Sequence, residues 1–113
     1  MTKESERIRD ERAGQEAADP DRLLPGEDPA TSYADDAQKW IEVYDELLRF
    51  KSRLLEVAEE TLKDVHGKPA RHEVVETDKV VLETEVNRFR NRLAFWRKRL
   101  SELDRNGEAR QRG

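Results

Sequence analysis

The chain has 113 residues, enough for one domain, and 42% of them are charged whereas only 35% are hydrophobic. This ratio excludes a thick globular core and suits long helices that each bury one apolar stripe. Cysteine is absent, which excludes disulfide and thiolate chemistry, and no apolar run approaches the ~20 residues that span a bilayer. The charged stretch from Met1 to Arg12 lacks an apolar signal region, so we expect a cytoplasmic location.

Residues 1–30 are predicted to form a disordered acidic arm. This segment carries five basic and nine acidic side chains, few apolar ones, and three prolines that interrupt any helix. The pair Leu23-Leu24 is its one apolar feature. Two leucines between charged residues can act as a short docking peptide, but we favour their packing over the end of the helices that follow.

A first helix is predicted at residues 32–65. Ser32 at the N-cap, with Asp35 three positions on, is a variant of the capping box. The helical pattern then continues to Gly67 and Pro69, which are typical of the end of a helix. At 1.5 Å per residue, this helix would be roughly 50 Å long.

A turn is predicted at residues 66–76 and a second helix at residues 77–104. The β-branched residues in this stretch favour an extended backbone before the helix, although a helix that starts soon after Pro69 is an alternative. The whole hairpin covers residues 31–105, and the polar tail at residues 106–113 is expected to fray.

The second helix carries the most regular apolar pattern. From Leu82 to Leu103 its apolar residues follow at spacings of 4, 3, 4, 3, 4 and 3, which is the seam of a coiled coil. The first helix has a matching seam, and a short turn forces the two helices antiparallel. The predicted hairpin core comprises Trp40, Tyr44, Leu48, Leu55, Leu82, Val86, Phe89, Leu93, Trp96 and Leu100.

The first helix carries a second apolar seam beside the first. The combined stripe covers about half of the helix circumference, whereas one partner helix covers only a narrow part of it. We therefore expect an all-α, coiled-coil-like hairpin that pairs with a second copy in a homodimeric four-helix bundle; a different, regulatory protein partner is the alternative. The predicted partner-binding residues are Val43, Leu47, Phe50, Leu54 and Val57.

Charge also favours the antiparallel arrangement, because the acidic start of the first helix would lie beside the basic end of the second. With the turn centred near residue 70, Trp40 is expected near Leu100 and Lys51 near Phe89. Lys51 falls in the middle of the apolar stripe. It could fix the register, rest over the Phe89 ring or bind an anionic ligand, and we favour the structural roles.

The basic end of the second helix offers an alternative function. Arginines with an aromatic residue among them are typical of a modest nucleic-acid surface. These arginines encircle the helix, however, and the net charge of the chain is −4, so pairing with the acidic residues of the first helix is the favoured interpretation. The possible nucleic-acid contacts are Arg88, Arg92, Phe95 and Arg99.

No pattern in the sequence points to catalysis. The chain lacks a Gly-rich phosphate loop, a nucleophile elbow and a His-Glu metal motif. His66, His72 and Glu73 bracket the turn, but their spacing is not that of a zinc site. We therefore expect no enzymatic activity, no cofactor and no metal, and instead a protein–protein interaction module with a regulatory role, for example in transcription.

The predicted hairpin and its arginine-rich composition resemble small helical-hairpin anti-sigma factors. The nucleotide-binding repeat of that family, Glu-x3-Ser-x2-Arg-x3-Gln-x3-Asp, is absent from both helices. The resemblance therefore implies a shared architecture and transfers no site residue. The turn sequence His66-Gly67-Lys68-Pro69 also lacks the Trp-x-Gly signature of small secreted WXG hairpins.

Overall fold

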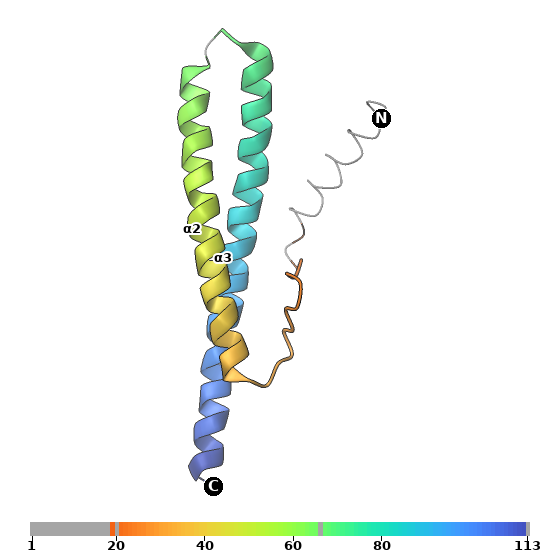
Figure 1. Ribbon diagram of the computed structural model, residues 1–113, viewed down its shortest axis with the longest axis vertical. Coiled ribbons are helices and arrows are strands. Elements are labelled where there is room, and N and C mark those ends of the chain that lie inside the picture. Colours follow the sequence, from red (N-terminus) through yellow and green to blue (C-terminus); the bar gives the residue numbers. More distant parts are fainter. Residues whose placement is uncertain (1–18, 20, 66, 113) are drawn as a thin grey trace, which may run out of the picture.

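Two long antiparallel helices make up most of the fold (Figure 1). The computed structural model describes residue 19, residues 21–65 and residues 67–112, with side chains as far as Asn106. Helix α2 spans Ala34–Asp64 and helix α3 spans Pro69–Arg112, and the described part of the chain contains no strand. The predicted all-α hairpin is therefore confirmed, while its assembly into a four-helix bundle stays a prediction.

Helix α2 starts two residues later than expected, and its cap differs. Tyr33 occupies the N-cap position and makes no side-chain capping bond, so the prediction of a Ser32 capping box is wrong. Just before the helix, the Thr31 hydroxyl accepts a hydrogen bond from the Tyr33 amide at 3.2 Å and donates one to Asp36 Oδ2 at 2.6 Å. Asp35 and Asp36 lie in the first turn, where the helix dipole favours negative charge.

The turn is much shorter than predicted. Gly67 adopts a φ of +78°, and the Lys68 carbonyl already accepts a hydrogen bond from His72 at 3.0 Å. Helix α3 therefore starts at Pro69, where the missing amide and the fixed φ of proline suit the first helical position. The β-branched residues after Pro69 are helical, because their weak extended preference does not prevent a helix that is already started. At the other end, Gly107 does not terminate α3, which continues to Arg112.

The shorter turn changes the register of the hairpin by about one helical turn. Trp40 stacks on Trp96, with ring centroids 6.5 Å apart, and does not face Leu100. Lys51 Nζ lies 3.2 Å from Glu85 Oε2 and does not rest over Phe89. The antiparallel direction was predicted correctly, but these facing pairs were not.

The residues predicted as the hairpin core lie between the two helices, and they are buried unevenly. The buried members are Trp40, Tyr44, Val86, Phe89, Leu93 and Trp96. The half-buried members are Leu48, Leu55, Leu82 and Leu100. Four aromatic side chains, Trp40, Tyr44, Phe89 and Trp96, dominate the buried set, and we call them the aromatic core. They lie in the half of the hairpin far from the turn, and aromatic rings bury a large area each.

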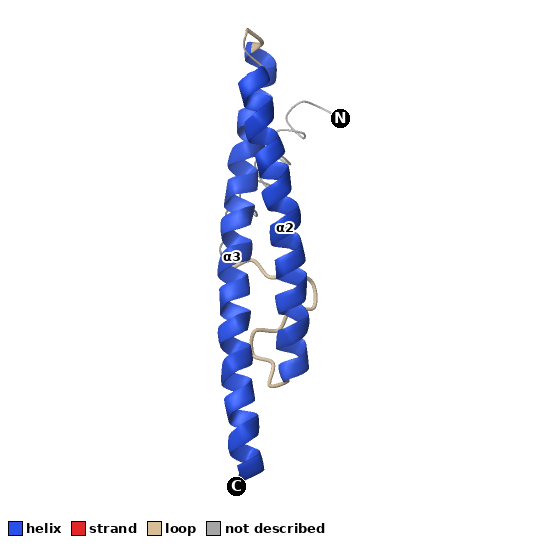
Figure 2. Ribbon diagram, turned by 90° about the vertical axis from the view of Figure 1, so that its left-hand side faces the viewer, coloured by secondary structure: helices blue, strands red, loops and turns tan. Residues whose placement is uncertain are grey.

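A segment before α2 folds back across this half of the hairpin (Figures 1 and 2). We call residues 21–33 the arm. Glu27 is buried and Leu24 is half-buried against the aromatic core, so the prediction of disorder is wrong for residues 21–30, and residues 1–18 and 20 lie outside the described part. The bond from the Glu27 amide to the Leu24 carbonyl at 3.0 Å, with Gly26 at a φ of +83°, closes a type II turn.

Neither of the helices in the described part of the chain has a stretch that is long and apolar enough to cross a bilayer.

Candidate functional site

The Glu27 carboxylate joins the arm to both helices. Its side chain is fully buried. Oε1 accepts hydrogen bonds from the Tyr44 hydroxyl and, at 2.9 Å, from the Leu24 amide. Oε2 accepts hydrogen bonds from Trp96 Nε1 at 2.7 Å and from Arg92 Nη2 and Nε at 2.6 and 3.2 Å. Buried polar groups need such partners, and this carboxylate has them on both oxygens.

These contacts shift two pKa values in opposite directions. Burial on its own would raise the pKa of Glu27, but the hydrogen bonds from Tyr44, Arg92, Leu24 and Trp96 together outweigh it and lower that pKa. Burial and the neighbouring Glu27 carboxylate raise the pKa of Tyr44 to about 12. The charged carboxylate and the neutral phenol are thus the forms that the folded protein stabilises.

The Glu27 site is closed, and each of its oxygens is used at least twice. A carboxylate that acts as an acid or a base needs an oxygen within reach of the substrate. Neither oxygen of Glu27 is accessible, because its side chain is fully buried. Its geometry instead suits a structural role, in which it holds the arm on the aromatic core. We call the contacts of Glu27 with Leu24, Tyr44, Arg92 and Trp96 the latch.

The four candidate nucleic-acid contacts are engaged inside the protein. Arg88 and Arg92 are buried, with 5% and 9% of their surface exposed. Arg99 Nη2 donates a hydrogen bond to the Thr31 carbonyl at 2.9 Å, and the Arg92 guanidinium lies 4.4 Å from the centre of the Phe95 ring. Phosphate binding needs basic groups on the surface, whereas Arg88 and Arg92 are buried and Arg99 is bonded to the arm.

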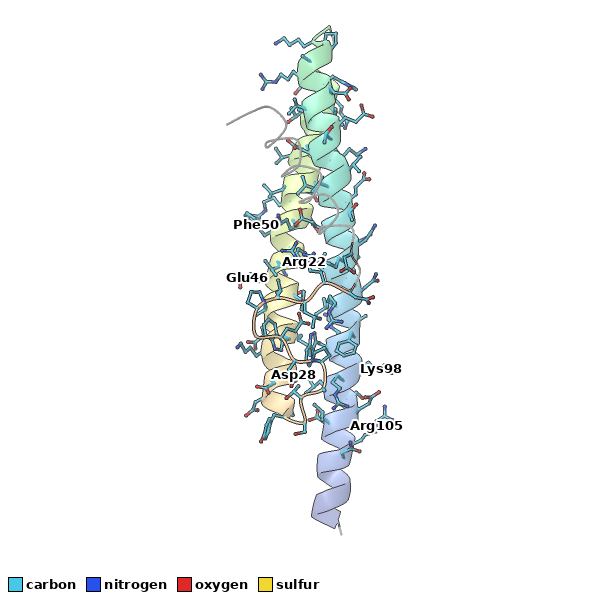
Figure 3. All side chains as sticks on the ribbon, turned by 90° about the vertical axis from the view of Figure 1, so that its right-hand side faces the viewer. Arg22, Asp28, Glu46, Phe50, Lys98 and Arg105 are labelled. Carbon is cyan, nitrogen blue, oxygen red and sulfur yellow. The ribbon has the colours of Figure 1, made fainter. Side chains whose placement is uncertain are left out.

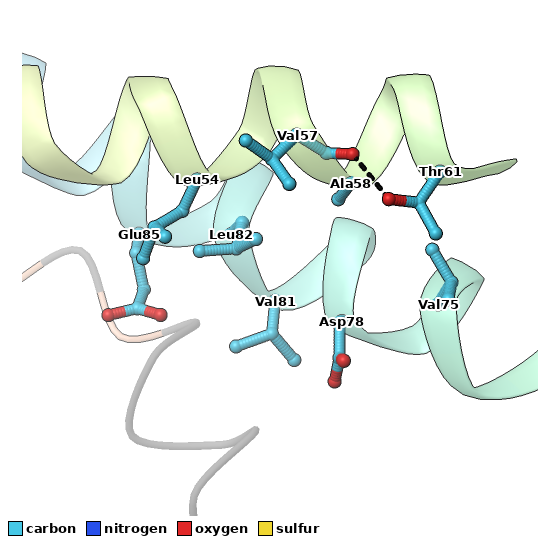
Figure 4. A pocket seen from close by; sticks show the side chains of 9 residues that line it. All are labelled: Leu54, Val57, Ala58, Thr61, Val75, Asp78, Val81, Leu82 and Glu85. Carbon is cyan, nitrogen blue, oxygen red and sulfur yellow. Dashed lines mark hydrogen bonds between the residues drawn. The ribbon is translucent and has the colours of Figure 1, made fainter.

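The other half of the hairpin, next to the turn, has an open apolar groove of about 450 Å³ between the two helices. Figure 4 shows side chains of both helices along its walls. Its lining residues are Leu54, Val57, Ala58, Thr61, Val75, Asp78, Val81, Leu82 and Glu85. We call this the turn-side groove.

The five residues predicted to bind a partner divide between the two halves of the hairpin. Val43 and Leu47 are half-buried and pack against the aromatic core. Phe50, Leu54 and Val57 remain exposed, with 58%, 37% and 57% of their surface accessible. Figure 3 shows Phe50 on α2 beyond the point where the arm crosses. Internal packing therefore satisfies one part of the seam, and the part beside the turn-side groove stays open.

Lys51 marks the border between the aromatic core and the turn-side groove. Its ion pair with Glu85 links α2 to α3, and the two side chains are only 24% and 17% exposed. A polar pair inside an otherwise apolar seam fixes the register of two helices. The amine therefore already has a carboxylate partner within the chain, which favours the structural interpretation of Lys51 over an anion-binding one.

Sequence reasoning missed Glu27 and Thr31, although the Pro-Gly turn that positions Glu27 was visible. The helix partners of Glu27 are far away in the sequence, and helical periodicity carries no signal for a contact made by a loop. His72 pairs with Glu76 at 3.5 Å, His66 lies outside the described residues, and no group of three metal-binding side chains occurs in the part that is described.

Comparison with protein-family models, curated proteins and solved structures finds no match for this chain.

Proposed function

We propose that this chain is a non-enzymatic protein–protein interaction module with a regulatory role, which binds a helical partner through the turn-side groove. The observation that carries the proposal is the exposure of Leu54 and Val57, which line that groove on α2, together with Phe50, which is exposed one helical turn before them. A cytoplasmic location is part of the proposal, because a chain without cysteine suits a reducing compartment.

The spacing of these three residues supports a helical partner. They are four and three positions apart and therefore share one face of α2. Single exposed apolar side chains are common on protein surfaces. A stripe of them beside an apolar groove is the arrangement that accepts an amphipathic helix. Full burial of one such side chain contributes about 1.5–3 kcal/mol, so three of them can contribute several kcal/mol to binding.

Nucleic-acid binding was the alternative, and no observation now favours it. The arginines that would contact phosphate hold the arm or pack on aromatic rings.

The experiment compares two valines that differ in position but hardly in exposure. Val57 lines the groove, whereas Val80 lies on α3 outside it, and they are 57% and 56% exposed. The tagged full chain is expressed in its source organism, and the mass of its complexes is measured on a native sizing column. We expect Val57→Glu to remove the larger species and Val80→Glu to retain it, because only the first places a charge in the contact. A chain that runs alone in every variant, or complexes equally sensitive to both changes, would contradict the proposed function.

A further inference from the structure

We propose that the partner in the turn-side groove is a second copy of this chain, docked antiparallel so that the two α2 helices contact each other along the groove. This inference rests on the proposed function and names the occupant of the groove. A contact between identical surfaces must be self-complementary about a two-fold axis, so both the apolar residues and the charges of α2 can be examined for this property.

The apolar residues on the open edge of α2 are self-complementary. Phe50, Leu54 and Val57, followed by the half-buried Thr61 whose hydroxyl donates to the Val57 carbonyl, stand at spacings of 4, 3 and 4. This is the repeat of a helix-packing seam. A two-fold axis midway between Leu54 and Val57 places Leu54 of each copy against Val57 of the other. Phe50 of each copy then lies against Thr61 of the other, at the wall of the groove. The most exposed aromatic ring on α2 thereby gains a site that it lacks within one chain.

The charges that flank this seam are self-complementary in the same register. Arg53 and Glu60 lie on the side of the seam that faces away from α3, and both are exposed. In an antiparallel pair with the axis between Leu54 and Val57, Arg53 of each copy lies beside Glu60 of the other. Two ion pairs related by the two-fold axis result, and such flanking pairs set partner choice and orientation in helical assemblies. The two residues are seven positions apart in one chain, about 10 Å along the helix, so they do not pair with each other there.

The latched arm limits how far this contact extends. Glu27 and Leu24 of the arm cover the hairpin near the aromatic core. Within α2, the exposed large apolar side chains are Phe50, Leu54 and Val57, all in the half next to the turn. A two-fold axis centred on the turn-side groove uses this open part and leaves the arm in place. The contact is then short, about three helical turns from Phe50 to Thr61.

The test uses sedimentation equilibrium of the purified full chain and two charge-reversal variants. The wild-type chain is expected to dimerise. Arg53→Glu and Glu60→Arg should each weaken the dimer on the order of tenfold, because each places like charges at both symmetric pairs. An equimolar mixture of the two variants should recover wild-type affinity, because the mixed dimer restores opposite charges at both positions. Recovery on mixing also shows that each variant is folded.

Four results would overturn the inference, and only the last of them also contradicts the proposed function. A dimer that neither variant weakens has a different interface, and so has a dimer that the mixture does not restore. A wild-type chain that stays monomeric while its complexes in cells still depend on Val57 has a foreign partner, which leaves the proposed function intact. A monomeric chain without Val57-dependent complexes contradicts both.

Discussion

Glu27 is the residue on which the arrangement of the arm depends. Its carboxylate receives hydrogen bonds from the arm itself, from Tyr44 on α2 and from Arg92 and Trp96 on α3. Removing one member of a buried ion pair leaves the other charge uncompensated and costs about 3 kcal/mol or more. The latch therefore couples the position of the arm to the packing of the aromatic core.

The two shifted pKa values predict how stability depends on pH. Glu27 has a lowered pKa in the folded protein, so its contribution is present above the unfolded value of 4.5 and is lost as the pH falls through the folded pKa. Tyr44 has a pKa raised from 10.0 to about 12, so its contribution is complete below pH 10.0 and is lost as the pH rises towards 12. We expect the free energy of unfolding to fall at both ends of the pH range.

Urea unfolding followed by tryptophan fluorescence at a series of pH values measures this dependence. Relative to wild type, Tyr44→Phe should lose the alkaline part of the dependence. Glu27→Gln should lose the Glu27 part of the acid dependence and about 3 kcal/mol of stability near neutral pH. The exposed Glu46 provides the matched control. Glu46→Gln should change neither the acid dependence nor the stability near neutral pH. An acid dependence that is identical in wild type and Glu27→Gln would show that the latch is not formed in solution.

At the scale of single residues, apolar periodicity predicted which side chains are buried, whereas the buried polar contacts could not be predicted from the sequence. Trp40, Phe89 and Trp96 were predicted in the core because their helical spacing reports burial directly. Glu27 gave no such signal, since a carboxylate in a proline-rich segment is usually solvated. Its burial depends on three donors that only the folded hairpin brings together.

At the scale of the helices, the turn decides the register. The sequence correctly indicated two helices and their direction, because α2 has a continuous apolar stripe and Gly67 ends it. The favoured start of α3 at residue 77 was wrong by eight residues, and the alternative start close to Pro69 was correct. The sequence left both open, since Pro69 can follow one helix or begin the next. Because the register follows from the length of the turn, this one ambiguity displaced Trp40 and Lys51 from their true partners.

Gly67 provides a test of the turn. Its φ of +78° lies in the left-handed region, and a Cβ at this position would meet no atom within 4 Å beyond those of the adjoining residues. The cost of Gly67→Ala is therefore conformational only, and we expect a loss of about 1 kcal/mol in the free energy of unfolding by urea. Lys68→Ala, one residue further on, is the control and should cost less. Equal stabilities of Gly67→Ala and wild type would mean that the turn adopts another conformation.

At the scale of the whole molecule, the hairpin has a closed half and an open half. The width of the apolar stripe on α2 predicted that one companion helix would not cover it. Part of that requirement is met within the chain, where the arm packs Leu24 on the aromatic core. The remainder lies beside the turn, where Phe50 and Val57 are exposed. The stripe was visible in the sequence, but its division was not, because it depends on where the arm docks.

The most direct test of the open half is hydroxyl-radical footprinting of the full chain at increasing protein concentration. Phe50 lies on the proposed contact, whereas Tyr33, 70% exposed at the far end of α2, lies outside it and serves as the internal reference. We predict that oxidation of Phe50 decreases as the concentration rises while oxidation of Tyr33 stays constant. Equal oxidation of Phe50 at all concentrations would contradict self-association through the turn-side groove.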